Sequence, residues 1–201
     1  MKQKAPRWAW VAATGLGSGC LRPAPGTWGS LAALIAWCLL SLLLASPFSA
    51  WVLMHRTDPG LAARIYGAEV LFLLAPLAMA WLAVRAADLV VRETGEKDPG
   101  CIVAGEWAGM WITLWPMRWE IAQNLHRLAA PGWWRWLPML LVPFLVFRLL
   151  DIWKPWPVRQ IRALPGGGGV VADDVVAGLY GIPIVVLAAP LVLHALEGYL
   201  R

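Results

Sequence analysis

Long apolar runs alternate with short polar segments along the whole chain. The runs 31–54 and 175–193 contain no charged residue, and each is close to the about 20 residues that a helix needs to cross a bilayer. A third run, 70–84, continues to residue 91 around Arg85 and Asp88, and a shorter run covers 136–147. This pattern predicts helices that cross a membrane.

Two further segments are less regular. The segment 102–116 contains Glu106 and is short for a full crossing, so we expect it to be tilted, re-entrant or buried by its neighbours. The segment 117–136 mixes apolar residues with His126 and Arg127 and ends in tryptophans, which is typical of a helix at the membrane surface. We therefore expect one all-α domain over 1–201, a polytopic membrane helix bundle of about four to five transmembrane or re-entrant helices plus an interfacial helix.

The composition supports a membrane protein. Of the 201 residues, 60% are hydrophobic and 14% are charged, whereas a soluble domain has about 45–50% and about 25%. These values exclude a disordered chain, a nucleic-acid-binding arm and an ordinary soluble enzyme. The 15 tryptophans fit a protein with many residues at the headgroup boundary. The three cysteines are widely spaced and indicate no disulfide framework.

The formal net charge of +5 has two compatible interpretations. One is the positive-inside bias of membrane proteins, and the other is a site for an anionic substrate. If the N-terminus lies inside and five segments cross, then 1–30, 85–101 and 148–174 are cytoplasmic and hold most of the basic residues. This topology brings four polar segments to one face of the membrane.

The first two polar segments are rich in glycine. In 15–30, Thr27 or Ser30 can cap the following helix, and the free N–H groups at its start favour an anion, although a capped tight turn explains the residues equally well. In the second segment Glu106 lies in an apolar run beside Gly105 and Gly109. Helix packing through a GxxxG face explains the glycines but not the carboxylate.

The other two polar segments carry paired charges. Arg148, Asp151 and Lys154 are spaced to share one helix face, and taken alone they are explained by an intrahelical salt-bridge chain. Four glycines at 166–169 precede Asp173 and Asp174. We expect a flexible loop that delivers both carboxylates to the start of the last span, since N-capping explains only one of them.

Together these residues predict metal-assisted phosphoryl chemistry on a lipid. Carboxylates without histidine or cysteine partners select a hard cation such as Mg²⁺, and basic side chains beside them suit a phosphate group. The predicted metal ligands, which with Lys154 also form the predicted catalytic set, are Glu106, Asp151, Asp173 and Asp174. The predicted phosphate-binding residues are Thr27, Arg148, Lys154 and Arg159.

The motifs GSGCLRPAPGTWGSLAAL, GEWAGMWITL, FRLLDIWKPWPVR and GGGGVVADDVVAG resemble the phosphatidylglycerophosphatase A family. The resemblance implies a phosphoric monoester hydrolase that uses Mg²⁺ to convert phosphatidylglycerol phosphate into phosphatidylglycerol. It also implies a multi-pass protein of the bacterial inner membrane, and with the topology above the active site faces the cytoplasm. The expected partners are the phospholipid substrate and the bilayer, with no nucleic acid.

One position departs from the family pattern. The family usually has an Asp-Glu pair where this chain reads Gly105-Glu106. Asp98 compensates, or the metal keeps another water, or the chain is a weakened member with an altered substrate.

A non-enzymatic reading also stays open. A small membrane transporter or assembly subunit would use the carboxylates as an ion path, and it would carry polar residues at mid-membrane on several spans. Within the enzymatic reading, the residues leave open whether water or a carboxylate is the nucleophile.

Overall fold

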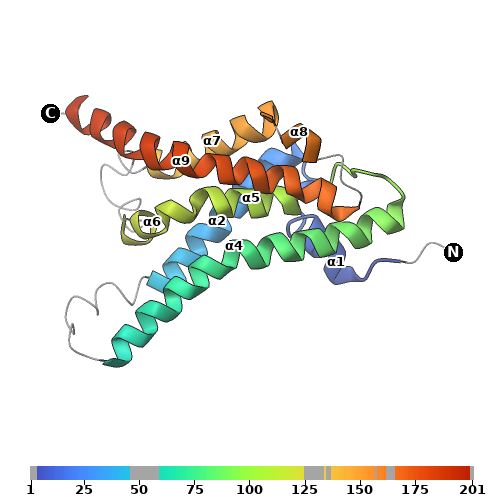
Figure 1. Ribbon diagram of the computed structural model, residues 1–201, viewed down its shortest axis with the longest axis horizontal. Helices are drawn as coiled ribbons and strands as arrows, with labels where there is room; N and C mark the ends of the chain where they lie inside the picture. Colours follow the sequence, from blue (N-terminus) through green and yellow to red (C-terminus); the bar gives the residue numbers. More distant parts are fainter. Residues whose placement is uncertain are drawn as a thin grey trace.

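The computed structural model describes residues 4–45, 59–124, 134, 137–156, 158–161 and 166–199. These residues form helices and short turns without a strand (Figure 1), so the predicted all-α class is confirmed. The helices are α1 (Arg7–Ala13), α2 (Pro25–Ala45), α4 (Pro59–Thr94), α5 (Ala104–Leu114), α6 (Arg118–Asn124), α7 (Pro138–Trp153), α8 (Val158–Ile161) and α9 (Gly167–Tyr199).

Three of the described helices are long and apolar enough to cross a membrane. The candidate spans are Pro25–Leu43 in α2, Val70–Thr94 in α4 and Gly167–Ala195 in α9. Their outward sides expose leucines such as Leu43, Leu77 and Leu187, which is the surface expected where a helix faces lipid. The first span begins earlier than the predicted 31–54, and residues 46–54 lie outside the described part.

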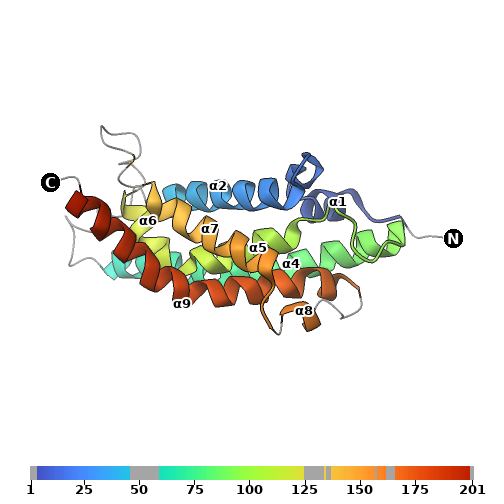
Figure 2. The same ribbon diagram turned by 90° about the horizontal axis from the view of Figure 1, so that it is seen from above.

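The helices α5 and α7 are shorter than the spans. With 11 residues, α5 rises about 16 Å, roughly half of the hydrocarbon thickness. Nearly all of its residues are buried, and it packs against α9, α4 and α2, between which it lies in Figure 2. The prediction that neighbours bury this segment is confirmed. Helix α7 continues past the predicted 136–147 through Arg148 and Asp151.

The surface helix predicted for 117–136 is described only in part. Helix α6 covers Arg118–Asn124, and Ile121 on it is fully buried in the core. Residues 125–133, 135 and 136 lie outside the described part of the chain.

The glycine-rich stretch before Asp173 and Asp174 is helical, so the predicted loop is wrong. Helix α9 begins at Gly167, which places both aspartates in its second turn. The backbone N–H of Gly167 donates to Asp88 Oδ1 of α4 at 3.2 Å, and a Cβ at Gly167 would lie 2.5 Å from the Val84 carbonyl oxygen. A neighbouring helix thus caps α9, and glycine permits the close approach.

A second set of glycines lets α5 approach α9. A Cβ at Gly109 would lie 2.5 Å from Phe147 Cε2 and would meet the Asp174 carbonyl, and one at Gly178 would lie 2.5 Å from the Gly109 carbonyl oxygen. The hydroxyl of Thr113 donates to the Gly109 carbonyl at 2.9 Å. The helix-packing role of the GxxxG face is therefore real.

The chain path gathers the polar segments at one end of the bundle. The starts of α2, α5 and α9 and the end of α7 all lie toward the end where the N-terminus is marked in Figure 1. Because α7 runs back toward this end, its charged last turns meet the second turns of α9 and α2.

Replacing Gly109 with alanine should destabilise the bundle. The new methyl group overlaps Phe147 and the α9 backbone, and overpacking of this kind costs about 1–3 kcal/mol. Gly67→Ala is the matched control, because no atom lies within 4 Å of its added Cβ and alanine favours the helix by up to about 1 kcal/mol. Thermal unfolding in detergent measures both, and equal midpoints would contradict the packing.

Candidate active site

The last turns of α7 carry an ion-pair chain. Arg148 Nη1 lies 2.6 Å from Asp151 Oδ2, and Lys154 Nζ lies 3.6 Å from Asp151 Oδ1. These are the i, i+3 neighbours that the spacing predicts. The chain does not end within the helix, because Lys154 also pairs with Asp173 of α9 and Arg148 Nη1 donates to Ser30 Oγ of α2 at 3.3 Å. The cations therefore join three helices.

Lys154 is held in an unusual backbone conformation. It is the C-cap of α7 with φ 46° and ψ 68°, in the left-handed region, and its N–H donates to the Leu150 carbonyl. Pro155 follows it and cannot continue the helix. A non-glycine residue in this region costs of the order of 1–3 kcal/mol, which the surrounding contacts of Lys154 must offset.

Four carboxylates approach one another beside these cations. Asp151, Asp173 and Asp174 are buried, and Asp174 lies within electrostatic reach of the other three acidic groups. Glu106 lies within reach of Asp151, Arg148 and Lys154. These six described residues place four carboxyl groups beside two cations, Arg148 and Lys154, so a bound cation would complete the compensation of charge.

Glu106 is enclosed by the first turn of α2. A Cβ at Gly26 would lie 2.6 Å from Glu106 Oε1 and 3.2 Å from Arg148 Nη1. Gly26 is therefore a point of close approach between the α2 backbone and a carboxylate and guanidinium of the site. The sequence gives one hint of this contact. Gly26 lies within the first turn of a helix, where glycine does not favour helix formation, so a close approach by another group is a reason for glycine there.

Gly105 lies directly beside Asp174. A Cβ at this position would meet Asp174 Oδ2 and would lie 3.3 Å from the Val170 carbonyl oxygen. The carboxylate of Asp174 thus fills the space from which a side chain at 105 would project. Asp98, considered above as a substitute acid, is exposed in the loop before α5.

Of the four predicted phosphate-binding residues, the structure places two in the charge cluster. Arg148 and Lys154 lie in the cluster, and Thr27 is exposed on the first turn of α2. The backbone of Arg159 is in α8, but its side chain lies outside the described part. Helix α2 begins at Pro25, so the idea that Thr27 or Ser30 caps it is wrong. Ser30 instead donates to the Gly26 carbonyl at 2.8 Å and accepts from Arg148.

The carboxylates provide oxygen ligands, but among the described residues they do not already surround a metal position. In the part of the chain that the structure describes, no three histidine, cysteine, aspartate or glutamate side chains stand grouped to hold a metal ion. Asp151 and Asp173 instead pair with Arg148 and Lys154. Mg²⁺ is usually bound through one or two carboxylates, several waters and a phosphate. The donor chemistry fits such a site, whereas a closed site of the zinc type does not fit.

Comparison with known proteins agrees with the family resemblance that the four polar segments indicate. The family model described as Phosphatidylglycerophosphatase A matches residues 11–189. The chain belongs to this family. Phosphatidylglycerophosphatase A of Escherichia coli K12 is 33% identical over 83% of this chain and 75% of its own length, and that of Haemophilus influenzae is 31% identical over 86% and 83%. No solved structure matches.

A third relative carries a different name. The putative phosphatidylinositol-3-phosphatase of Bacteroides thetaiotaomicron is 35% identical over 87% of this chain and 89% of its own length. All three names describe a phosphatase that acts on a phospholipid. The predictions of family and enzyme class are therefore confirmed, and the chain is a lipid phosphatase with helices that can span a membrane.

Gly26→Ala should lower phosphatase turnover about 100-fold, because its methyl group would displace Glu106 and Arg148 and small misplacements of reacting groups have effects of that size. Gly100→Ala is the control, since nothing lies within 4 Å of its added Cβ. Phosphate release by the purified proteins measures the effect. A Gly26→Ala enzyme as active as the control would show that this contact does not position the site.

Proposed function

We propose that this chain hydrolyses phosphatidylglycerol phosphate to phosphatidylglycerol and inorganic phosphate, with Mg²⁺, at the cytoplasmic face of the bacterial inner membrane. The supporting observation is the cluster itself, in which Glu106, Asp151, Asp173 and Asp174 meet Arg148 and Lys154 at one end of the bundle. Two relatives named for this activity support the choice of substrate.

The placement of charge favours an enzyme over an ion path. Among the described residues, the charged side chains that are buried are Asp151, Asp173 and Asp174, all in this cluster. The other buried polar side chains within the candidate spans are the hydroxyls of Ser30 and Ser41. Charge concentrated at one boundary suits a headgroup reaction, whereas an ion path needs polar groups through the membrane.

Mg²⁺ held by a subset of the four carboxylates would supply charge neutralisation and orientation of the phosphate. The chain's own cations add to this effect. Arg148 is fixed by Asp151 and Ser30, so its guanidinium is preorganised for phosphate oxygens. Lys154 is paired with Asp173 and, in this proposal, turns toward the phosphate when substrate arrives.

The reaction is a displacement at phosphorus. The oxygen of a water molecule bonds to phosphorus as one of its protons passes to a carboxylate, the ester P–O bond breaks, and the glycerol oxygen leaves as the alcohol after the protonated carboxyl group returns that proton. Glu106 and Asp174 are the carboxylates of the cluster without an ion pair within 4 Å among the described residues, so one of them accepts the proton of the attacking water. Positioning and charge stabilisation supply most of the rate.

The orientation follows from charge. The elements at the site end are α1, the segment before α2, the end of α4 and the loop after it. They contain Arg7, Arg22, Arg92 and Lys97, and segments rich in basic residues stay on the cytoplasmic side. The phosphate of the substrate then lies at the headgroup plane beside the ends of α7 and α9.

The test of substrate and metal is phosphate release in detergent micelles. We expect release from phosphatidylglycerol phosphate that requires Mg²⁺, disappears with a chelator and returns when Mg²⁺ is restored. Phosphatidic acid and phosphatidylinositol 3-phosphate are the comparison lipids. No release from phosphatidylglycerol phosphate under any divalent metal would defeat the proposal, and faster release from phosphatidylinositol 3-phosphate would transfer the assignment to that lipid.

Asp151→Asn should lower kcat by about 100-fold or more, as loss of a preorganised electrostatic group does. Stability should fall much less than turnover, since asparagine keeps the shape of the side chain and an oxygen acceptor for Arg148, which also keeps its hydrogen bond to Ser30. Glu120→Gln, at an exposed acid on α6, is the control. Comparable loss of turnover and of thermal stability in Asp151→Asn would instead assign the residue to a structural salt bridge.

A further inference from the structure

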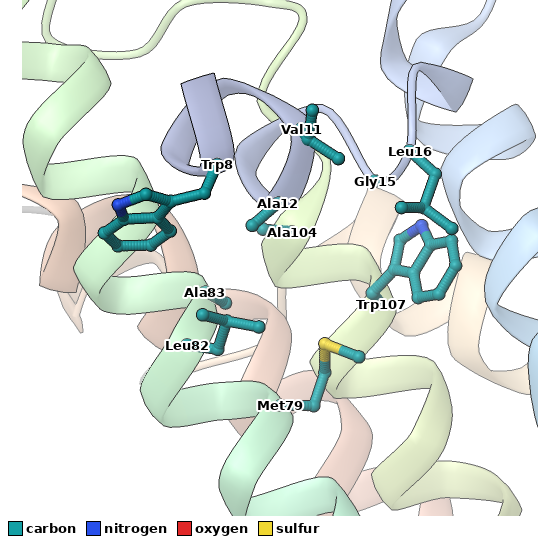
Figure 3. A pocket seen from close by; sticks show the side chains of 10 residues that line it. All are labelled: Trp8, Val11, Ala12, Gly15, Leu16, Met79, Leu82, Ala83, Ala104 and Trp107. Carbon is teal, nitrogen blue, oxygen red and sulfur yellow. The ribbon is translucent and has the colours of Figure 1, made fainter. Parts of the chain in front are cut away.

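A cavity of about 390 Å³ lies between α1, α4 and α5, and the reaction proposed above does not use it. Figure 3 shows side chains from all three helices pointing into it. Helix α1 contributes Trp8, Val11 and Ala12, spaced to form one face of the helix. The volume falls within the about 300–1,000 Å³ of small-ligand pockets.

The lining of the cavity is apolar throughout. Helix α4 contributes Met79, Leu82 and Ala83, and α5 contributes Ala104 and Trp107. None of the lining residues is charged, and the indole N–H of Trp107 is directed to Ser18 Oγ at 3.4 Å. A polar ligand would find no complementary group among them, whereas the burial of a hydrocarbon chain is favourable in proportion to its apolar area.

One wall of the cavity belongs to a helix that can cross a membrane. Met79 and Leu82 belong to the candidate span Val70–Thr94. On the other wall, Trp8, Val11 and Leu16 are 49%, 50% and 74% exposed, so the edge of the cavity joins an exposed apolar strip on α1 and the turn after it. At a membrane boundary such an apolar strip would lie among lipids, so a lipid acyl chain is the apolar ligand nearest to the cavity.

We propose that the cavity between α1, α4 and α5 binds one acyl chain of a bilayer phospholipid. The chain enters from the membrane along α4 and lies beneath α1, against Trp107. Such a lipid would hold α1 and the Gly15–Leu16 turn against α5.

The occupant is a bilayer lipid and not the substrate, because α5 separates the two regions. Ala104 and Trp107 face the cavity, whereas Gly105 faces Asp174 and Glu106 faces Gly26 and Arg148. A lipid whose phosphate lies among the carboxylates would have to pass around α5 to place its chain in the cavity.

The experiment uses the full chain in phosphatidylcholine nanodiscs that contain phosphatidylcholine with a photoreactive diazirine in one acyl chain. Cross-linked peptides are quantified by mass spectrometry relative to those that contain Leu187 and Leu191 of α9, which are exposed and report ordinary lipid contact. We expect stronger labelling of the peptides that contain Val11 and Leu82. Ala12→Phe and Leu82→Trp fill the cavity from opposite walls, and each should lower this labelling about tenfold by excluding about two methylene groups.

Ala78→Phe is the matched control, because Ala78 is exposed on α4 and is not part of the lining. The proposal is supported if labelling is unchanged in the control and lowered in both cavity-filling variants. If one of these variants is not monodisperse, the result of the other decides. Labelling equal to that of α9, or unaffected by a filler, overturns it. Loss of the label in proportion to added phosphatidylglycerol phosphate would show that the substrate fills the cavity, which also overturns it. The cross-linking measurement does not depend on turnover. The acyl-chain proposal can therefore fail while the proposed function holds, and the reverse.

Discussion

The structure depends on balancing charge where water is scarce. Asp151, Asp173 and Asp174 are buried beside or within helices that can span a membrane, and an unpaired buried charge is strongly unfavourable. Arg148 and Lys154 compensate part of this charge by joining α7 to α2 and α9. These contacts tie the helix ends together, so the groups that bind phosphate in the proposed mechanism also help to fix the arrangement of the helices.

The short helix α5 makes this meeting possible. It lies between α2, α4 and α9, and its successive residues serve different neighbours. Gly105 and Gly109 bring the α9 backbone close, Glu106 turns toward α2 and α7, and Trp107 meets the turn after α1. Since α5 covers about half of the hydrocarbon thickness, its first turn lies at the end of the bundle where the charges gather.

The sequence predicts the helical class, the membrane character and the residues of the cluster, because charge within apolar runs is costly and therefore informative. It does not predict that 167–174 is helical, since glycine disfavours helix and the stabilising contact comes from Asp88, distant in the chain. It also misses α1, whose seven residues are too few for a clear periodic pattern. The pairing of Lys154 with Asp173 and the contact of Gly26 with Glu106 depend on how helices are rotated against one another, which one sequence does not specify.

The missing side chain at position 105 has an evolutionary consequence. Asp174 occupies the place where a Cβ at 105 would stand, so aspartate cannot return there by a single step without moving Asp174 or separating α5 from α9. The side chain that position 105 can hold therefore depends on the rotamer of Asp174. An exchange at 105 alone meets a steric barrier, and a second change on α9 would have to accompany it.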